Sequence, residues 1–167
     1  MSVVNILKQA DIFDELTPTQ LELIASICSE KTMQAGDVIF QENSPGHELY
    51  IIANGEVDIF VDPSLVGKES TTGTYTIATL RRGQSFGEVA LVDQGLRSAG
   101  ARCMQPDTRL VAIPRDKLML LCDTYSQLGY RLMRNLAADL AMKIRHTDLQ
   151  VREQLTWTHG NPDTANS

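Results

Sequence analysis

The sequence predicts an α+β protein that is mainly β, with a sandwich or jelly roll of short strands between helices at both ends of the chain. Three observations support this prediction. Apolar residues recur at roughly helical spacing over residues 1–29. Over residues 30–113 they alternate with a period of two, and turn signals interrupt the alternation roughly every 8–12 residues. From residue 114 the helical spacing returns.

Composition and charge exclude several classes of protein. A length of 167 residues and an apolar content of 43% suit one globular domain. No apolar run is long enough to cross a bilayer, and the N-terminus lacks the basic segment of a secretory signal. The net charge of −6 argues against a broad nucleic-acid-binding surface. Cys28, Cys103 and Cys122 are odd in number and widely separated, so we interpret them as reduced core thiols of a cytoplasmic protein.

Two helical segments are expected before the strands. The first carries apolar residues at roughly helical spacing, namely Leu7, Ile12, Phe13 and Leu16. The second begins with Thr17 as its N-cap, Pro18 at the first helical position and Gln20 completing a capping box. An apolar face then continues to Ser29.

Short strands are expected at residues 31–34, 38–41, 49–54, 56–61, 75–80, 99–104 and 109–113. Asn54-Gly55 separates two of these segments and is a strong signal for a type I′ hairpin. Residues 62–73 are polar and rich in Gly, Ser and Thr, which indicates a loop or a longer hairpin tip. Residues 81–84 form a further expected turn. The whole pattern indicates roughly eight strands.

Two helices are expected after the strands. One begins at Pro114 and runs to Cys122, and a long one runs from about Ser126 to Gln154. One apolar edge of the long helix suits docking on the strands and consists of Leu128, Leu132 and Leu136. A second edge fits heptads, with Tyr130, Ala137, Ile144 and Val151 at one position and Met133, Leu140, Thr147 and Gln154 at the other. From the residues alone, this edge suits either a homodimer seam or a plain amphipathic helix folded on its own domain.

Residues 82–98 combine the features of a site for a sugar phosphate. Gly87 allows close backbone approach, and a helical turn starting at Glu88 presents free N–H groups. The guanidinium of Arg97 can fork two hydrogen bonds onto a phosphate, and the hydroxyl of Ser98 can add a third. The carboxylate of Glu88 only accepts hydrogen bonds, so it suits a ribose hydroxyl. Taken alone, the Phe86-Gly87-Glu88 segment also suits an ordinary turn, and Arg97 also suits a solvated surface cation.

The segment FGEVALVDQGLRSA resembles the phosphate-binding cassette of cyclic nucleotide-binding domains, the family of bacterial catabolite activators and protein kinase A regulatory subunits. The resemblance covers roughly residues 10–155. It implies an eight-stranded β-roll, with a lid of N-terminal helices and a short cassette helix. Asn43 and His47 depart from the family pattern, in which glycine and an acidic residue are common. The implied domain is residues 1–155, with N-terminal helices at 1–29, the β-roll at 30–113, C-terminal helices at 114–155 and a flexible tail at 156–167.

The resemblance also implies the role of each pocket residue. Glu88 accepts the ribose 2′-hydroxyl and Arg97 pairs with the cyclic phosphate. The expected ligand-binding set is Val61, Leu80, Phe86, Gly87, Glu88, Val89, Ala90, Arg97 and Ser98, of which Phe86, Val61 and Leu80 line the base. Lys143, Thr147 and Asp148 of the long helix are expected near the base, and Trp157 is a weaker candidate for a cap.

The resemblance implies a regulatory module that binds cyclic AMP, transmits binding through its long helix and forms a homodimer through that helix. Cyclic GMP is the first competing ligand, because in the family that this chain resembles a hydroxyl at the position of Ser98 can also favour a guanine amino group. A protein-interaction module with a relic pocket is the other alternative. Enzymatic activity is not expected, because the chain has three histidines and no P-loop or HExxH motif. We expect an unidentified effector protein as a partner. We expect no cofactor, no metal, no association with a membrane and, unless the chain is a fragment, no DNA binding.

Overall fold

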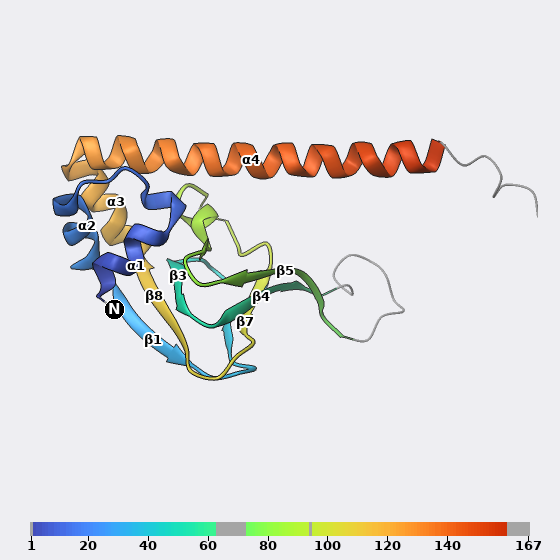
Figure 1. The fold of residues 1–167 in the computed structure, drawn as a ribbon, viewed down its shortest axis with the longest axis horizontal. Helices are drawn as coiled ribbons and strands as arrows, with labels where there is room; N and C mark the ends of the chain where they lie inside the picture. Colours follow the sequence, from blue (N-terminus) through green and yellow to red (C-terminus); the bar gives the residue numbers. More distant parts are fainter. Residues whose placement is uncertain (1, 63–72, 94, 160–167) are drawn as a thin grey trace, which may run out of the picture.

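A computed structural model describes residues 2–62, 73–93 and 95–159. Within these residues eight antiparallel strands form two four-stranded sheets, which confirms the predicted α+β, mainly β, fold (Figure 1). The first sheet has the order β1 (Ser29–Met33), β8 (Thr108–Pro114), β3 (Glu48–Asn54) and β6 (Ser85–Phe86). The second has the order β2 (Val38–Phe40), β7 (Gly100–Cys103), β4 (Glu56–Val61) and β5 (Tyr75–Arg81).

The helices lie before, within and after the strands. They are α1 (Val3–Gln9), η1 (Asp11–Phe13), α2 (Pro18–Ala25), η3 (Glu88–Leu91), α3 (Arg115–Thr124) and α4 (Ser126–His159). The predicted capping box of α2 is confirmed, because the Thr17 side chain accepts from the Gln20 amide and the Gln20 side chain accepts from the Thr17 amide. α4 reaches His159, so residues 156–159 of the expected tail are helical. The rest of that tail lies outside the described residues.

The hairpin predicted at Asn54-Gly55 is wrong. β3 and β4 flank this dipeptide, but they belong to different sheets, and the chain turns a corner of the roll between them. Gly55 has a φ of +100°, and a Cβ there would lie 2.5 Å from the Thr108 Oγ1. The glycine therefore serves a close approach to β8. The Asn54-Gly55 dipeptide indicates that the chain turns, but it does not indicate which strands pair, because the pairing partners lie far away in the sequence.

Strand β6 was not predicted, because two residues are too few to show a period. Its register is set by β3, with Tyr50 opposite Phe86 and Ile51 opposite Ser85. The expected loop at residues 62–73 lies almost wholly outside the described residues. The strands on either side of it pair as expected, since β4 and β5 are antiparallel neighbours.

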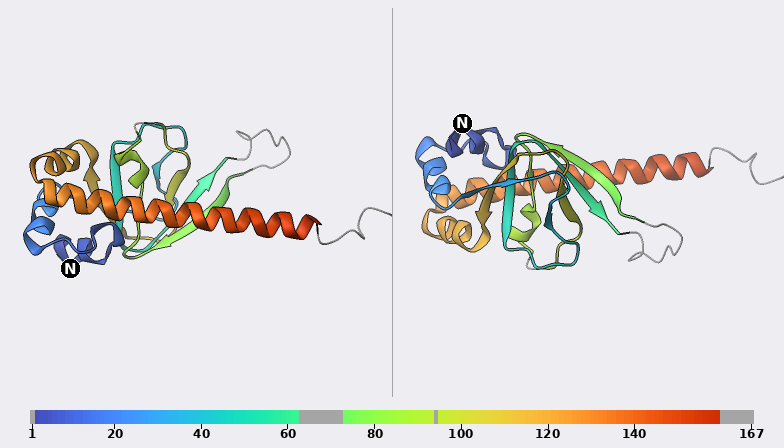
Figure 2. Two further views of the ribbon diagram at one scale, coloured as in Figure 1. Left: turned by 90° about the horizontal axis from the view of Figure 1, so that it is seen from above. Right: turned by 90° about the horizontal axis from the view of Figure 1, so that it is seen from below.

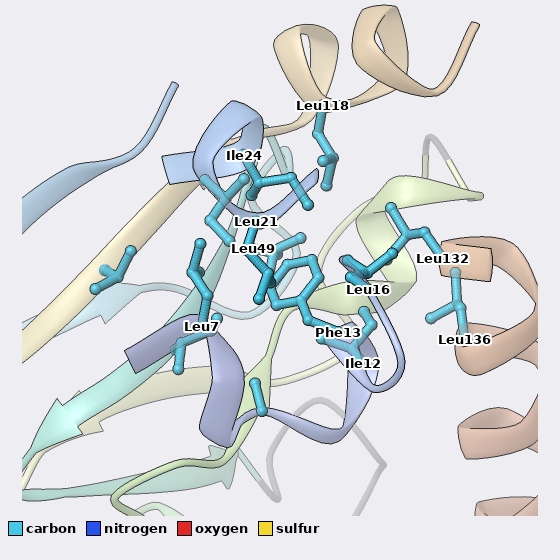
Figure 3. Packing of buried hydrophobic residues seen from close by; sticks show 14 of the residues in the cluster. Leu7, Ile12, Phe13, Leu16, Leu21, Ile24, Leu49, Leu118, Leu132 and Leu136 are labelled. Carbon is cyan, nitrogen blue, oxygen red and sulfur yellow. The ribbon is translucent and has the colours of Figure 1, made fainter. Parts of the chain in front are cut away.

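Two hydrophobic clusters lie on opposite faces of the first sheet. Along β8, Val111 and Ile113 belong to one cluster and Leu110 and Ala112 to the other, as the period of a strand requires. The larger cluster joins this sheet to α1, α2 and α3 and to the buried leucines of α4, Leu128, Leu132 and Leu136 (Figure 3). The docking of α4 predicted from these leucines is thus confirmed.

Helix α4 crosses the whole domain, and its C-terminal part extends beyond the roll (Figures 1 and 2). All residues from Ala141 to Trp157 are exposed. This helix covers the side of the roll at which η3 lies (Figure 1).

The cysteines are free thiols in partly or fully buried surroundings. Burial raises the pKa of Cys28 to about 12 and that of Cys122 to about 11, the latter with help from the negative charge of Asp123. These two thiols are therefore protonated and unreactive at neutral pH.

Candidate functional site

A cavity of about 730 Å³ lies between the second sheet, residues 82–99 and α4. Its wall combines apolar side chains from the strands with charged side chains from the cassette and α4. It contains most of the site residues expected from the sequence, namely Leu80, Phe86, Gly87, Glu88, Val89, Ala90, Arg97, Ser98 and Lys143.

Arg97 is held in the wall by carbonyl groups. Its Nη2 donates to the Glu48 carbonyl at 2.6 Å and its Nη1 donates to the Gly87 carbonyl at 3.3 Å. The guanidinium lies 4.1 Å from the centre of the Phe40 ring, and the residue is 8% exposed. Its Nε is buried and has no hydrogen-bond partner among the described residues. A buried cation with an unused donor favours an anionic ligand with several acceptor oxygens.

Burial lowers the pKa of Arg97, and the neighbouring Tyr50, Glu48 and Glu88 oppose that shift. The guanidinium nevertheless stays charged, because an arginine does not lose its proton in a protein. The cavity wall therefore contains a permanent positive charge.

Two glycines make room for this guanidinium. Gly87 caps η3 with a φ of +81°, and a Cβ there would lie 2.7 Å from the Arg97 Nη1. A Cβ at Gly46 would lie 2.9 Å from the Arg97 Nε. Sequence reasoning identified Gly87 but not Gly46. No local signal links Gly46 to an arginine 51 positions away.

The turn after Gly87 is a 3₁₀ helix, close to the short helical turn predicted at Glu88. The Ala90 amide, expected to face a phosphate, donates to the Gly87 carbonyl at 3.2 Å. This bond closes the turn, so the Ala90 amide already has an acceptor in this structure.

Glu88 is 4% exposed and forms an ion pair with Lys143 of α4. The Lys143 Nζ also lies 2.9 Å from the Asp139 Oδ2, one helical turn earlier. Burial lowers the pKa of Lys143, but its hydrogen bonds to Glu88 and Asp139 outweigh that effect and raise it. Lys143 was expected near the base, and here it contacts the expected ribose acceptor.

Four expected residues lie outside the described wall of this cavity. Val61 follows a register shift after Ile59, and Ile59 lines the wall in its place. Thr147 and Asp148 are exposed, one helical turn beyond Lys143, where α4 has passed the cavity. Trp157 is 76% exposed near the end of α4.

Sequence reasoning also missed other residues of the site. Phe40 supports the guanidinium, Ile59 adds apolar wall, and Asp139 holds Lys143. Alternation in β2 and β4 marks Phe40 and Ile59 only as sheet residues, and the i, i+4 spacing of Asp139 and Lys143 is common on any helix surface.

The described residues include no cluster of three metal-binding side chains of the His, Cys, Asp or Glu type. The helices in the described ranges also lack the combination of length and apolar character needed to cross a bilayer.

The family model of the cyclic nucleotide-binding domain matches residues 30–125, which include the whole cassette and both sheets except the first residue of β1. The chain belongs to the cyclic nucleotide-binding domain family. The resemblance stated from the cassette residues is thus confirmed over more than half of the chain.

Relatives in two regulatory classes agree with this family. The cyclic AMP receptor protein of Thermus thermophilus is 33% identical over 145 residues, which is 87% of this chain and 62% of that protein. A crystal structure of the Thermus thermophilus catabolite activator protein has a TM-score of 0.73 at 30% identity, covering 87% of this chain and 63% of that one. A cAMP-dependent protein kinase regulatory subunit of Hypocrea atroviridis is 30% identical over 57% of this chain and 18% of its own length. This chain thus spans less than two thirds of each relative.

Proposed function

We propose that this cyclic nucleotide-binding domain is a regulatory module that binds cyclic AMP. The observation that carries the proposal is the Arg97 guanidinium, buried in a cradle of two glycines with an unused donor at Nε. A cyclic phosphate would supply acceptor oxygens and the opposite charge. The Thermus relative is a cyclic AMP receptor protein and the Hypocrea relative is a regulatory subunit of a cAMP-dependent protein kinase, which supports this nucleotide for the present chain.

Other groups in the wall suit the rest of the nucleotide. The Glu88 carboxylate is an acceptor for a ribose hydroxyl, and Ile59, Leu80 and Phe86 offer apolar surface to a purine. Ser98 is exposed at the same wall, and its hydroxyl is the feature that keeps cyclic GMP as the competing ligand. The module acts by binding and not by catalysis, in line with its regulatory family.

We further propose that α4 carries the signal and joins two copies of the chain. Tyr130, Ile144 and Val151 are spaced by multiples of seven residues, and all three are exposed apolar side chains. Such a row fits one position of a coiled-coil seam, which would be covered by the same row of a second copy. We also propose that the signal passes to an effector protein. A cytoplasmic location is proposed as well, on the ground of the unpaired cysteines.

Calorimetric titration with cyclic AMP and cyclic GMP tests the ligand. We expect micromolar or tighter binding of cyclic AMP, weaker binding of cyclic GMP, and a loss of about 100-fold in Arg97→Ala. Arg145→Ala removes the same charge from an exposed position of α4 and is the matched control. Because Arg97 also holds two carbonyls, Arg97→Lys should be titrated as well, since it keeps the cation and loses the fork.

The outcomes separate the alternatives. Tighter binding of cyclic GMP than of cyclic AMP would make cyclic GMP the proposed ligand and would leave the proposed regulatory module unchanged. The absence of heat with both nucleotides, in protein that was unfolded and refolded to remove carried-over ligand, would contradict the proposal. A relic pocket in a protein-interaction module would then be the better account.

A further inference from the structure

The Lys143–Glu88 ion pair joins two elements that are distant in sequence. Glu88 lies on η3 in the cavity wall, and Lys143 lies 55 residues later on α4. The Glu88 side chain is 6% exposed, whereas that of Lys143 is 56% exposed. The ammonium therefore enters from the solvent side and neutralises a carboxylate that lies deep in the cavity.

This ion pair uses the group that the proposed ligand needs. An ionised carboxylate only accepts hydrogen bonds, and the Glu88 Oε1 accepts one from Lys143. A ribose hydroxyl that donates to Glu88 must approach the same buried carboxylate past the lysine side chain. Lys143 and Asp139 both line the cavity, so the ligand and α4 meet at this point.

We infer that Lys143 is a latch: it occupies the ribose-binding carboxylate in the ligand-free protein, and the nucleotide and α4 compete for Glu88. The inference rests on the proposed function. It concerns a residue that sets the affinity of the site, and it assigns Lys143 a role opposed to the expected contact with the base.

Asp139 lowers the cost of opening the latch. Its Oδ2 already lies 2.9 Å from the Lys143 Nζ on the same helix, and its side chain is 37% exposed. A displaced ammonium therefore keeps one charged partner in a hydrated position. Glu88, in turn, exchanges a charged donor for the ribose hydroxyl, so its buried acceptor stays satisfied.

The position of Lys143 on α4 gives the competition a structural output. Towards the N-terminus α4 is held by buried leucines, and residues 141–157 are exposed. Among the described residues lining the cavity, Lys143 is the one furthest along α4. Opening this contact releases the C-terminal half of the helix while the docked half stays in place, which is a shift between two populations.

The test is calorimetric titration of cyclic AMP into the wild type, Lys143→Met, Lys143→Arg and Arg145→Met. Methionine keeps the apolar stem and removes the charge, whereas arginine keeps the charge. Arg145→Met makes the same change in charge at an exposed position about 200° around the helix from Lys143. We expect on the order of 10-fold tighter binding in Lys143→Met and changes of less than about 3-fold in the other two variants.

A second ligand separates the latch from general charge effects. 2′-Deoxy cyclic AMP lacks the hydroxyl that competes for Glu88, so Lys143→Met should gain less than about 3-fold with it. Equal or weaker binding of cyclic AMP in Lys143→Met, with a wild type that binds, would overturn the latch and leave the proposed function standing. An equal gain with both nucleotides would also overturn it.

The proposed function fails in a different way. If neither the wild type nor Lys143→Met binds either nucleotide, the site is not a cyclic nucleotide site and the competition is rejected with it. Binding by Lys143→Met alone would support a latch that the ligand cannot open. Thermal unfolding of each variant shows whether the fold is intact, and Lys143→Arg provides the comparison if Lys143→Met is destabilised.

Discussion

The two halves of α4 have the same secondary structure but opposite surroundings. In the first half Leu128, Leu132 and Leu136 are buried against the N-terminal helices and the first sheet (Figure 3). In the second half Ile144 is 62% exposed and Leu149 is 56% exposed. Apolar periodicity occurs in both halves, so it does not decide which half is docked. Docking depends on whether the domain lies beneath the helix.

Polar contacts mark the extent of the docked half. The Asn135 Nδ2 donates to the Ile12 carbonyl at 3.1 Å and to the Asp14 carbonyl at 2.8 Å. Arg131 pairs with Glu15 at 2.6 Å. Lys143, paired with Glu88, follows as a contact near the boundary between the halves. The sequence of contacts along α4 therefore runs from a packed core to a single ion pair.

The largest expected effect comes from removing a leucine of the docked half. Leu132→Ala should lower the free energy of unfolding by about 2–5 kcal/mol, because it leaves a cavity among fully buried side chains. Leu149→Ala makes the same change in the exposed half and should cost less than about 0.5 kcal/mol. Urea unfolding monitored by circular dichroism measures both. Similar costs for the two variants would contradict the comparison.

The next effect concerns the exposed half and tests the proposed homodimer. Ile144→Glu places a charge in the seam and should weaken the dimer about 100-fold, since a carboxylate would be buried without a partner. Leu149→Glu carries the same charge at a position five residues further along, off the heptad row, and should leave the dimer intact. Analytical ultracentrifugation over a range of concentrations measures both. A wild type that stays monomeric at high concentration would reject the dimer.

A smaller effect is expected where α4 touches α3. Gly129 is buried, and a Cβ there would lie 2.7 Å from the Cys122 carbonyl oxygen. Gly129→Ala should therefore destabilise the fold by about 1–2 kcal/mol, although alanine is the better helix former. Ala141→Gly in the exposed half should cost about 1 kcal/mol through helix propensity alone. Thus glycine is favoured over alanine at position 129, and alanine is favoured over glycine at position 141.

The smallest effect is expected from shortening the exposed half. A chain ending at Leu149, made in the Ile144→Glu background to remove any dimer, should unfold with a free energy within about 0.5 kcal/mol of its parent. The physical reason is that residues 150–157 are exposed. A larger loss would show that the end of α4 packs on the roll in solution.

Local sequence signals determined the elements of this protein. The capping box at Thr17, the alternation in β8 and the leucine row of α4 each depend on residues close together in the chain, so spacing alone revealed them. The pairing of FGE with Arg97, nine residues after Glu88, predicted residues that the structure places in one cavity wall. The family that this segment indicated is confirmed by the family model.

Only the tertiary structure decided the contacts between distant segments. The turn at Gly55 looks like a hairpin in sequence, yet β3 pairs with β8 and β6 whereas β4 pairs with β7 and β5. The space for Arg97 depends on Gly46, and Glu88 meets a lysine from α4. Hydrogen bonding and burial across the whole chain select these partners. The reason is that a strand edge or a buried charge needs a partner that its neighbours in sequence cannot supply.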